Sequence, residues 1–319
     1  MVNAQENHVH VSWMTRGASM FEALISVTCL RERALDASKI TVFIQDVGEG
    51  SIEAYEGILD WLKSRDVAVS DSGAEGFGDD LWQALPYLGL RQFSDVPFAV
   101  FDPGTLFWGD DLFDDVTGYA SRSDRSEWPV EHLYGPTREQ IWQAVSEVSS
   151  VEMSKLVDAG HHPAAWRHWP HLDGRIYIGA NAGAFGEVFA KQAKRILHNT
   201  PEVLAAQEVR RDLRKIVLPL VHAECGETLT QNKPAMPGVF PANRLAFLYA
   251  AAPEAAIDHL ESAVAQNHVK KLLRLYEPAR KLIYQRKGRE LRKRFYNPEG
   301  QDPQRLIRRL QTHTNWWVR

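Results

Sequence analysis

The sequence lacks several features that would assign it to a common class of protein. Only two cysteines occur among its 319 residues, Cys29 and Cys225, and they lie far apart. Their spacing fits no metal or redox motif, so we expect buried thiols in a reducing compartment. No apolar run reaches the roughly 18 residues that a membrane-spanning helix requires. The first ten residues lack the basic and apolar regions of a signal peptide, which predicts a cytoplasmic protein.

Three nucleotide-binding and catalytic signatures are also missing. The segment 15–21 reads TRGASMF and lacks the Gly-x-Gly-x-x-Gly pattern of dinucleotide-binding folds. No Gly-x-x-x-x-Gly-Lys-Ser/Thr loop occurs, which argues against P-loop chemistry. The absence of a Gly-x-Ser-x-Gly elbow argues against an α/β-hydrolase.

The charge of the chain is unevenly distributed, although its net value is only −4. Residues 270–319 contain fifteen Lys or Arg and four Asp or Glu, a balance of +11, whereas the first 269 residues carry −15. The simplest interpretation is that this basic arm packs against the acidic part of its own chain or of a second subunit. It could otherwise bind phosphate, anionic lipid or nucleic acid.

Strand-like and helix-like segments alternate along the first hundred residues. The strand at 96–102 is apolar on both faces, which is typical of a parallel sheet covered on both sides. The pattern predicts an α/β fold with a doubly wound, mostly parallel sheet. Ser19 is a plausible N-cap of the first helix. The predicted strands are 8–15, 39–46, 67–71 and 96–102, and the predicted helices are 19–35, 51–65 and 78–93.

Polar side chains follow each of the four predicted strands. In doubly wound sheets, ligands bind beyond the carboxyl ends of the parallel strands. The sequence therefore predicts a ligand-binding crevice at this edge, with Asp102 at its mouth. The four residues are Thr15, Asp46, Asp71 and Asp102.

The phrase VFDPGTLFWGDDLFDDV at 100–116 resembles the GT-A glycosyltransferases, especially the glycogenin-like group. That family reads Asp-x-Asp-Thr, an apolar stretch, Gly-Asp and then Leu-Phe. Asp102, Thr105, Gly109 and Asp110 match this pattern, and Gly104 stands where the second acid would be. The resemblance covers roughly residues 8–200 and implies a nucleotide-sugar site.

A second phrase, GRIYIGANAGAF at 174–185, resembles the family's strand that carries Asn-Ala-Gly. The resemblance implies that Asn181 lies near the donor sugar and close to Asp102, and that the two share a catalytic role. A helix is expected to follow at 186–199. Thr15, Asp46 and Asp102 are the expected donor-binding residues of the strand ends.

The missing second acid leaves three interpretations of the metal site. Asp102 can hold Mg²⁺ or Mn²⁺ together with Asp110 or Asp111 further along the loop. Basic residues of the C-terminal arm can instead neutralise the diphosphate without a metal. The fold can also serve as a nucleotide-sugar or glycan-binding module without transfer activity.

Histidines provide further candidates. The glycogenin-like group completes its metal shell with a late histidine followed by a lysine, and QNHVKKLL at 266–273 resembles that phrase. The resemblance implies a metal ligand at His268 and diphosphate contacts at Lys270 and Lys271; His222 is the competing histidine. The loop 159–174 has four histidines and two tryptophans but no zinc-ligand spacing, so we expect it to cover the crevice.

The last part of the chain is predicted to be helical and basic. We expect a nucleotide-sugar-binding domain at 1–250 and a basic helical extension at 251–319. The extension ends in NWWVR, which suits either the inner surface of a membrane or a subunit contact. It contains no recognisable nucleic-acid module, so no nucleic-acid partner is expected.

We therefore interpret the sequence as a glycosyltransferase that uses a nucleotide-sugar donor and a glycan acceptor. By resemblance, a role in bacterial surface polysaccharide synthesis is expected. The alternatives are a non-catalytic binding module of the same fold, or an assembly protein that acts through its basic arm.

Overall fold

The computed structural model describes residues 8–33, 39–45, 52–71, 75–77, 81, 83–109, 119–122, 128–156, 172–225, 238–240, 244–297 and 303–313. Within these residues, six strands form one sheet in the spatial order β3-β2-β1-β4-β7-β6. The strands are β1 (Val9–Met14), β2 (Lys39–Ile44), β3 (Val67–Ser70), β4 (Phe98–Phe101), β6 (Tyr119–Arg122) and β7 (Leu172–Gly179).

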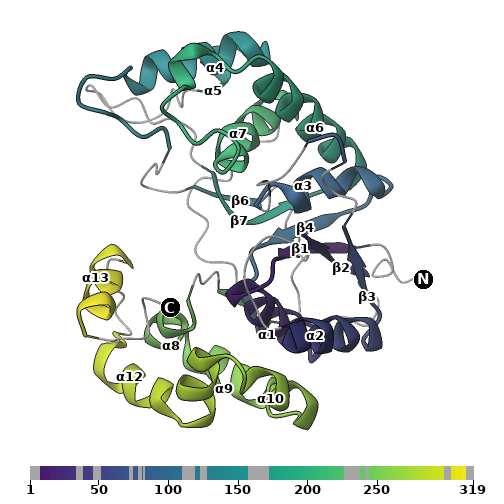
Figure 1. The fold of residues 1–319 in the computed structure, drawn as a ribbon, viewed down its shortest axis with the longest axis vertical. Helices are drawn as coiled ribbons and strands as arrows, with labels where there is room; N and C mark the ends of the chain where they lie inside the picture. Colours follow the sequence, from purple (N-terminus) through teal and green to yellow (C-terminus); the bar gives the residue numbers. More distant parts are fainter. Residues whose placement is uncertain are drawn as a thin grey trace.

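The direction of the strands confirms the predicted fold class. β1 pairs in parallel with β2 and β4, and β2 pairs in parallel with β3. Within this sheet, β7 runs in the opposite direction to the other strands, because it is antiparallel to both β4 and β6. The sheet is therefore mostly parallel, and helices cover both of its faces (Figure 1).

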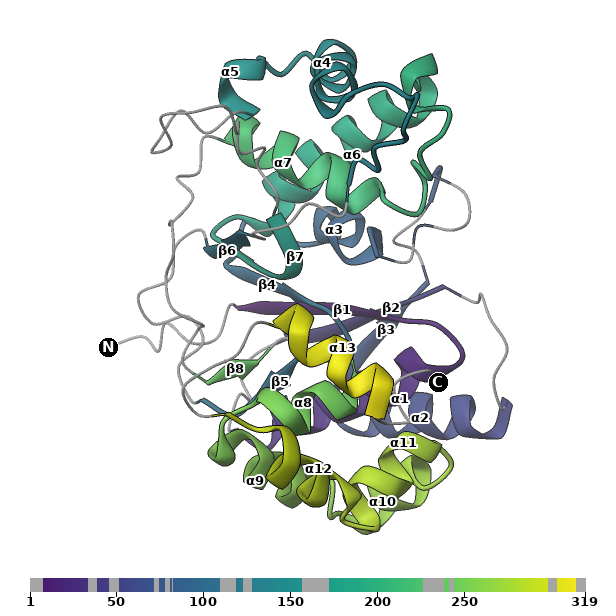
Figure 2. The same ribbon diagram turned by 90° about the vertical axis from the view of Figure 1, so that its left-hand side faces the viewer.

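The helices separate into two layers. The first layer comprises α1 (Ala18–Arg31), α2 (Ile52–Ser64), α8 (Leu245–Ala251), α9 (Glu254–Ala263), α10 (Asn267–Leu273), α11 (Glu277–Ala279), α12 (Lys287–Phe295) and α13 (Pro303–His313). The second comprises α3 (Leu85–Gly89), α4 (Arg138–Ser149), α5 (Met153–Leu156), α6 (Ala182–His198) and α7 (Leu213–Cys225). Figure 2 shows the sheet between the two layers.

Alternation along the strands supplies a core to each layer. In β4, Phe98 and Val100 join the core beneath α3, α6 and α7, whereas Ala99 and Phe101 join the core with α1 and α2. Successive side chains of a strand point to opposite faces, so an all-apolar strand must be covered twice. The apolar run at 96–102 therefore encodes the central position of β4.

Two local predictions in the first half need correction. Ser19 lies inside α1, whose N-cap is Gly17 with a positive φ of 107°. The Ser19 hydroxyl instead accepts a hydrogen bond from the Thr15 amide at 2.9 Å.

The two thiols also differ from each other, because Cys29 is buried, as expected, but Cys225 is exposed. Burial raises the pKa of the Cys29 thiol well above its ordinary value.

The predicted strand at 174–185 is too long, since β7 ends at Gly179 and α6 begins at Ala182. The glycines of this segment allow α6 to approach the backbone at 90–94. A Cβ on Gly183 would lie 2.6 Å from the carbonyl oxygen of Phe93, and one on Gly186 would lie 2.3 Å from the amide nitrogen of Arg91. The Asn-Ala-Gly phrase thus begins a helix and serves its packing.

The C-terminal helices belong to the same core as α1 and α2. Buried residues of α10, α12 and α13 lie in the cluster that contains the inner faces of α1 and α2; among them are Leu272, Leu291 and Leu310. Removing residues 270–319 would therefore expose part of this core to solvent.

The predicted domain boundary at residue 250 falls within α8 and stays a prediction. None of the helices in the described ranges is long and apolar enough to cross a bilayer.

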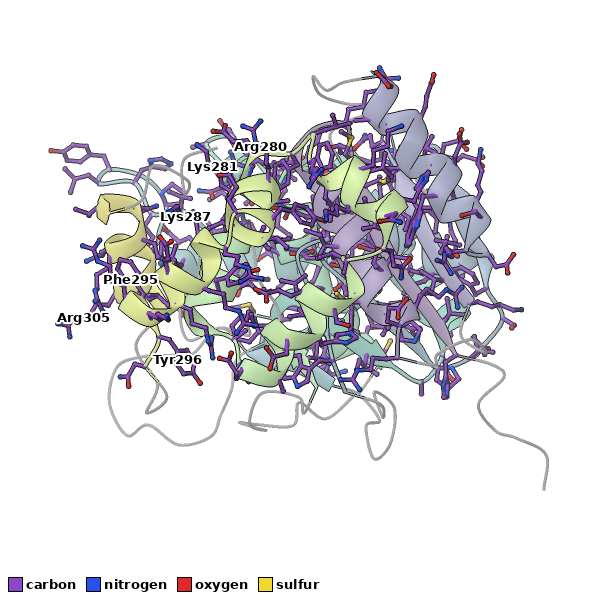
Figure 3. The ribbon with its side chains drawn as sticks, turned by 90° about the horizontal axis from the view of Figure 1, so that it is seen from below. Arg280, Lys281, Lys287, Phe295, Tyr296 and Arg305 are labelled. Atoms are coloured by element: carbon purple, nitrogen blue, oxygen red, sulfur yellow. The ribbon has the colours of Figure 1, made fainter. Side chains whose placement is uncertain are left out.

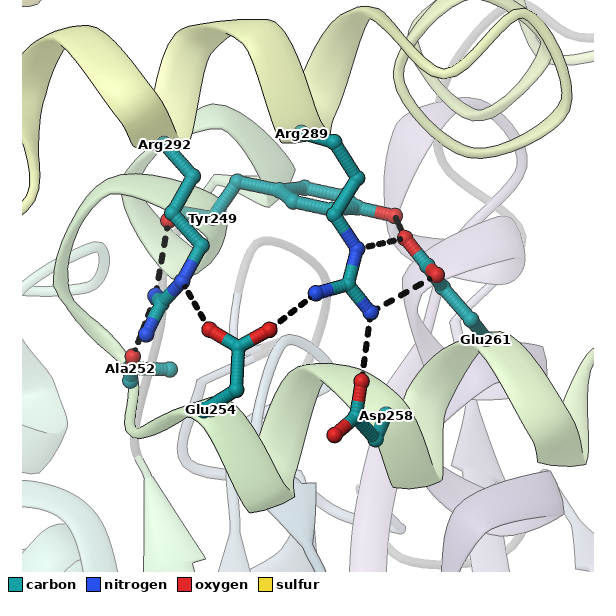
Figure 4. A network of polar contacts seen from close by, with 7 residues as sticks. All are labelled: Tyr249, Ala252, Glu254, Asp258, Glu261, Arg289 and Arg292. Carbon is teal, nitrogen blue, oxygen red and sulfur yellow. Dashed lines mark hydrogen bonds and ion pairs between the residues drawn. The ribbon is translucent and has the colours of Figure 1, made fainter.

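Two arginines of the basic arm pair with acidic residues of α9 (Figure 4). Arg289 contacts Asp258 at 2.6 Å, Glu261 at 2.9 Å and also Glu254. Arg292 contacts Glu254 at 2.6 Å and donates a hydrogen bond to the carbonyl of Ala252, also at 2.6 Å. For these arginines, the interpretation that the arm packs on its own chain is confirmed.

A short ribbon follows the central strand. β5 (Leu106–Phe107) pairs antiparallel with β8 (Val239–Phe240). The Gly238 carbonyl accepts hydrogen bonds from the amides of Trp108, at 2.7 Å, and Gly109, at 3.1 Å. Gly238 has a φ of 79°, and a Cβ there would lie only 2.3 Å from the Cα of Gly109.

We expect Gly238→Ala to destabilise the protein by about 2–4 kcal/mol, since it adds a backbone clash to the strain of a left-handed residue. Gly76→Ala is the matched control, because Gly76 has a φ of 80° and open space at the Cβ position. The control should cost about 1 kcal/mol from strain alone. Urea unfolding of the three proteins is the measurement, and equal losses for both variants would contradict the clash.

Candidate functional site

The site lies where the parallel strands end. By the register of β1 and β4, Val11 stands opposite Val100. Trp13 therefore stands opposite Asp102, and Thr15 lies beyond it at the same edge. The Nε1 atom of Trp13 lies 3.4 Å from an Asp102 carboxylate oxygen. The predicted placement of Thr15 and Asp102 at the carboxyl edge is confirmed, and Asp71 likewise follows β3.

Asp102 begins a tight turn that α1 supports. The amide of Thr105 donates a 3.0 Å hydrogen bond to the Asp102 carbonyl, which closes the turn. Proline at its second position is typical of such turns, because its φ is already set. The Ser26 hydroxyl of α1 contacts the carbonyls of Pro103 and, at 2.6 Å, Thr105. This contact fixes the turn against the helix and hence the direction of Asp102.

The carboxylate of Asp102 is already paired within the chain. Arg214, in the first turn of α7, places its Nη1 atom 2.5 Å from the Asp102 Oδ1 atom. The side chains are 8% and 20% exposed, so the pair is largely shielded from water. Removing either partner of such a shielded pair leaves the other charge uncompensated, which strongly destabilises a protein. Asp102 and Arg214 therefore act as a unit.

A second carboxylate, Glu22, lies close to this pair. It stands on α1 one turn before Ser26 and so on the same face as the residue that holds the 103–105 turn. The side chain is half-buried, and its Oε1 atom is covered without a hydrogen-bond partner among the described residues. Burial raises the pKa of Glu22 from 4.5 to about 7.

Charged and aromatic neighbours surround Glu22. The positive charge of Arg244 opposes the rise in the pKa of Glu22, whereas the negative charge of Asp102 adds to it. Tyr276 lies on the same side, and its ring stacks on Phe21 with centroids 4.9 Å apart. Burial and then the charge of Glu22 raise the pKa of Tyr276 well above its ordinary value. The site thus combines two carboxylates with two arginines.

The expectation that Asn181 lies close to Asp102 is wrong. Because β7 is antiparallel to β4, Ile176 pairs with Phe101, whereas Gly179 pairs with Phe98. The amide after Asn181 donates to the carbonyl of Val96, before the start of β4. Asn181 is therefore at the opposite end of a strand about 10 Å long. The beginning of β7, at residues 172–175, is the part near Asp102.

The late histidine and lysines do not join the carboxyl edge either. They belong to α10, which packs against α2. Just before it, the side chain of Gln266 contacts Arg65 at 2.9 Å, at the far end of α2, and also Glu32. His268 is exposed near the start of this helix, and Lys270 lies 5.9 Å from the centroid of the Tyr284 ring. The structure thus gives His268, Lys270 and Lys271 no contact with Asp102.

His222 is buried near the core that lies beneath α3, α6 and α7. Its Nδ1 atom lies 3.3 Å from the Tyr177 hydroxyl. Four other predictions fall on residues outside the described ranges and stay predictions. These are Asp46, Asp110, Asp111 and the part of the aromatic loop at 157–171.

The described residues do not fit the metal that the Asp-x-Asp resemblance implies. Gly104 offers no ligand, and a guanidinium already occupies one oxygen of Asp102. A hard divalent cation needs about six oxygen ligands. Among the residues that the structure describes, no group of three or more His, Cys, Asp or Glu side chains could hold a metal ion.

Sequence reasoning missed three residues of the site, namely Glu22, Arg214 and Arg244. Glu22 reads as an ordinary polar position of a helix, and Arg214 is one of several basic residues at 210–215. No local motif marks them, because each is brought to Asp102 by the packing of a helix or loop. The only signal in the sequence is the four-residue spacing of Glu22 and Ser26, which places both on one face of the predicted helix.

We expect Glu22→Gln to become increasingly stabilising as the pH rises. Folding raises the pKa of Glu22 from 4.5 to about 7, so ionisation removes native stability between these values. Glutamine stays neutral. The advantage of the variant should therefore grow by about 2 kcal/mol between pH 5 and pH 8.

Urea unfolding at several pH values measures this difference. Glu56→Gln, at an exposed position of α2, is the matched control and should show no such trend. A constant difference between Glu22→Gln and the wild type would show that Glu22 ionises as it does in water.

Two glycosyltransferases are among the solved structures that resemble this chain. The WbbM bifunctional glycosyltransferase has 8% identity and a TM-score of 0.44, over 85% of this chain and 52% of that chain. This chain thus spans about half the length of WbbM. An active-site mutant of LgtC has 11% identity and a TM-score of 0.35, over 84% of this chain and 95% of that one. Neither likeness is close enough to transfer residue roles.

No curated protein matches the sequence. The sequence profile of the Rhodobacterales glycosyltransferase domain, by contrast, matches residues 14–226. This range begins in β1 and ends just after α7, so it contains Glu22, Asp102 and Arg214. It covers well over half of the chain. The protein therefore belongs to the Rhodobacterales glycosyltransferase domain family.

Proposed function

We propose that the protein transfers a sugar from a nucleotide-sugar donor to a glycan or related acceptor, with the donor diphosphate bound beside Arg214. The family membership supports transfer of a sugar, and the glycogenin-like phrase around Asp102 supports a nucleotide-linked donor. Synthesis of a bacterial surface polysaccharide is the setting that this resemblance suggests.

The observation that carries the proposal is the Asp102–Arg214 pair at the carboxyl edge of the sheet. In sugar transfer, the bond between the sugar C1 and the diphosphate oxygen breaks, and the electron pair stays on that oxygen. The acceptor hydroxyl oxygen forms the new bond to C1 and loses its proton. A cation beside the leaving oxygen stabilises the charge that develops there.

Arg214 has the properties that this role requires. Its guanidinium carries five N–H donors and always keeps its charge, so it can bind Asp102 and a phosphate together. Asp102 orients it, and the nearby Arg244 adds a second positive charge. In this proposal, arginines from α7 and from the segment before α8 take the role that a metal has in relatives with two acids.

We expect Arg214→Met to weaken UDP or GDP binding by at least about tenfold, since a charge-assisted hydrogen bond contributes about 1.5–3 kcal/mol. Calorimetric titration of each nucleotide is the measurement, with and without Mn²⁺. Mn²⁺ should change the affinity of the wild type little. Arg211→Met is the control, because this neighbour pairs with Glu208 and is 56% exposed.

Equal binding by the Arg214→Met variant and the wild type would contradict the assignment, and so would binding that requires Mn²⁺. Hydrolysis of the bound nucleotide sugar would then distinguish an active transferase from the non-catalytic binding module. An assembly protein would bind none of the nucleotides.

The C-terminal helices support a further part of the proposal, peripheral contact with an anionic membrane surface. Arg289 and Arg292 pair inward, but other basic residues of the arm face outward. Figure 3 shows Arg280, Lys281, Lys287 and Arg305 along the α11–α13 side of the molecule. Among the described residues from Arg280 onward, the exposed basic ones are Arg280, Arg286, Lys293, Arg294, Arg305, Arg308 and Arg309.

We expect Arg280→Glu, Arg305→Glu and Arg308→Glu, combined in one protein, to reduce binding to phosphatidylserine-containing vesicles about 100-fold. Each basic residue near an anionic surface contributes about 1 kcal/mol. These side chains are exposed, so the fold should persist. Vesicle sedimentation at low and high salt is the measurement.

The matched control combines Lys39→Glu, Lys63→Glu and Lys155→Glu, which change the net charge equally at exposed positions elsewhere. Equal losses in both proteins would show a general charge effect. Light scattering of the same proteins tests the alternative that this face joins two copies of the chain.

A further inference from the structure

The position of Glu22 has no role in the function proposed so far. Its helix face is fixed to the 103–105 turn by the hydroxyl of Ser26, one turn away. The side chain is half-buried, and one carboxylate oxygen is covered without a hydrogen-bond partner among the described residues. An unsatisfied buried oxygen is costly unless a ligand or a proton compensates for it.

The charges around Glu22 indicate which compensation applies. Asp102 on one side is negative, Arg244 is positive, and Tyr276 is a neutral phenol. Asp102 has a guanidinium at 2.5 Å, whereas among the described residues no ion pair of this kind stabilises a charge on Glu22. A buried carboxyl group beside a negative neighbour favours its neutral, protonated form.

We propose that Glu22 is a binding residue of the donor site that acts as a neutral carboxyl, donating its proton in a hydrogen bond to an anionic oxygen of the donor diphosphate. The inference rests on the proposed function, because it places the diphosphate beside Arg214 and Asp102. Nucleotide binding then takes up a proton from solution.

The physical reason is that an ionised Glu22 would repel the incoming diphosphate, whereas a protonated one supplies a donor. The bound anion further favours the neutral form, so the pKa of Glu22 in the complex lies above its value of about 7 in the free protein. By linkage, affinity falls as the pH rises above 7, by at most about tenfold per unit.

The experiment is calorimetric titration of UDP and GDP into the full chain near pH 8, in two buffers of different ionisation enthalpy. The dependence of the heat on the buffer gives the number of protons taken up. The wild type should take up about one proton more than Glu22→Gln. Comparing the two proteins removes the contribution of the nucleotide's own protonation, which is the same for both. Glutamine keeps a hydrogen-bond donor, so the variant should still bind.

Glu56→Gln, on the exposed face of α2, should behave as the wild type does. Binding that depends on Arg214 but shows equal proton uptake in the wild type and Glu22→Gln would overturn the inference and leave the proposed function intact. The absence of UDP and GDP binding to the wild type would overturn both. Thermal unfolding of each variant verifies that it is folded at the pH of the titration.

Discussion

The ion pair between Asp102 and Arg214 joins the central strand of the sheet to the helical layer that contains α7. Asp102 ends the central strand β4, and Arg214 begins α7 in the layer on one face. The turn after Asp102 is held from the other layer by Ser26 of α1. One short segment therefore links both helical layers at the carboxyl edge of the parallel strands. Trp13 and Arg214 both contact the carboxylate at the start of this segment.

Much of the fold could be predicted because it is encoded locally. Alternating strand and helix patterns predicted the parallel half of the sheet. The apolar residues on both faces of β4 indicated that this strand lies in the middle of the sheet. The direction of β7 could not be read in the same way, because an apolar strand has the same pattern in either direction. The resemblance placed Asn181 close to Asp102, whereas the direction of β7 puts it at the opposite end of the sheet. The glycines beside it then looked like a sugar-binding phrase, although they serve helix packing.

The candidate site could be predicted only where it follows a strand. Thr15 and Asp102 are fixed by the end of their strands, so topology alone located them. Glu22, Arg214 and Arg244 arrive through long-range packing and carry no local signature. The basic arm shows the same limit. Its composition indicated positive charge, but only the fold separates Arg289 and Arg292, which bind α9, from the arginines that face outward.

The residues of the site come from widely separated parts of the chain, from Glu22 to Tyr276. During synthesis, the sheet can begin to form once β7 has left the ribosome, but Arg244 and Tyr276 emerge later. Domains acquire their contacts in order of emergence, and distant pairings close slowly. The nascent chain therefore completes this cluster of charged and aromatic residues only after almost all of it has been made. In the proposed function, a chain that ends before Arg244 lacks part of the diphosphate site, so nucleotide binding would report on complete folding of the protein.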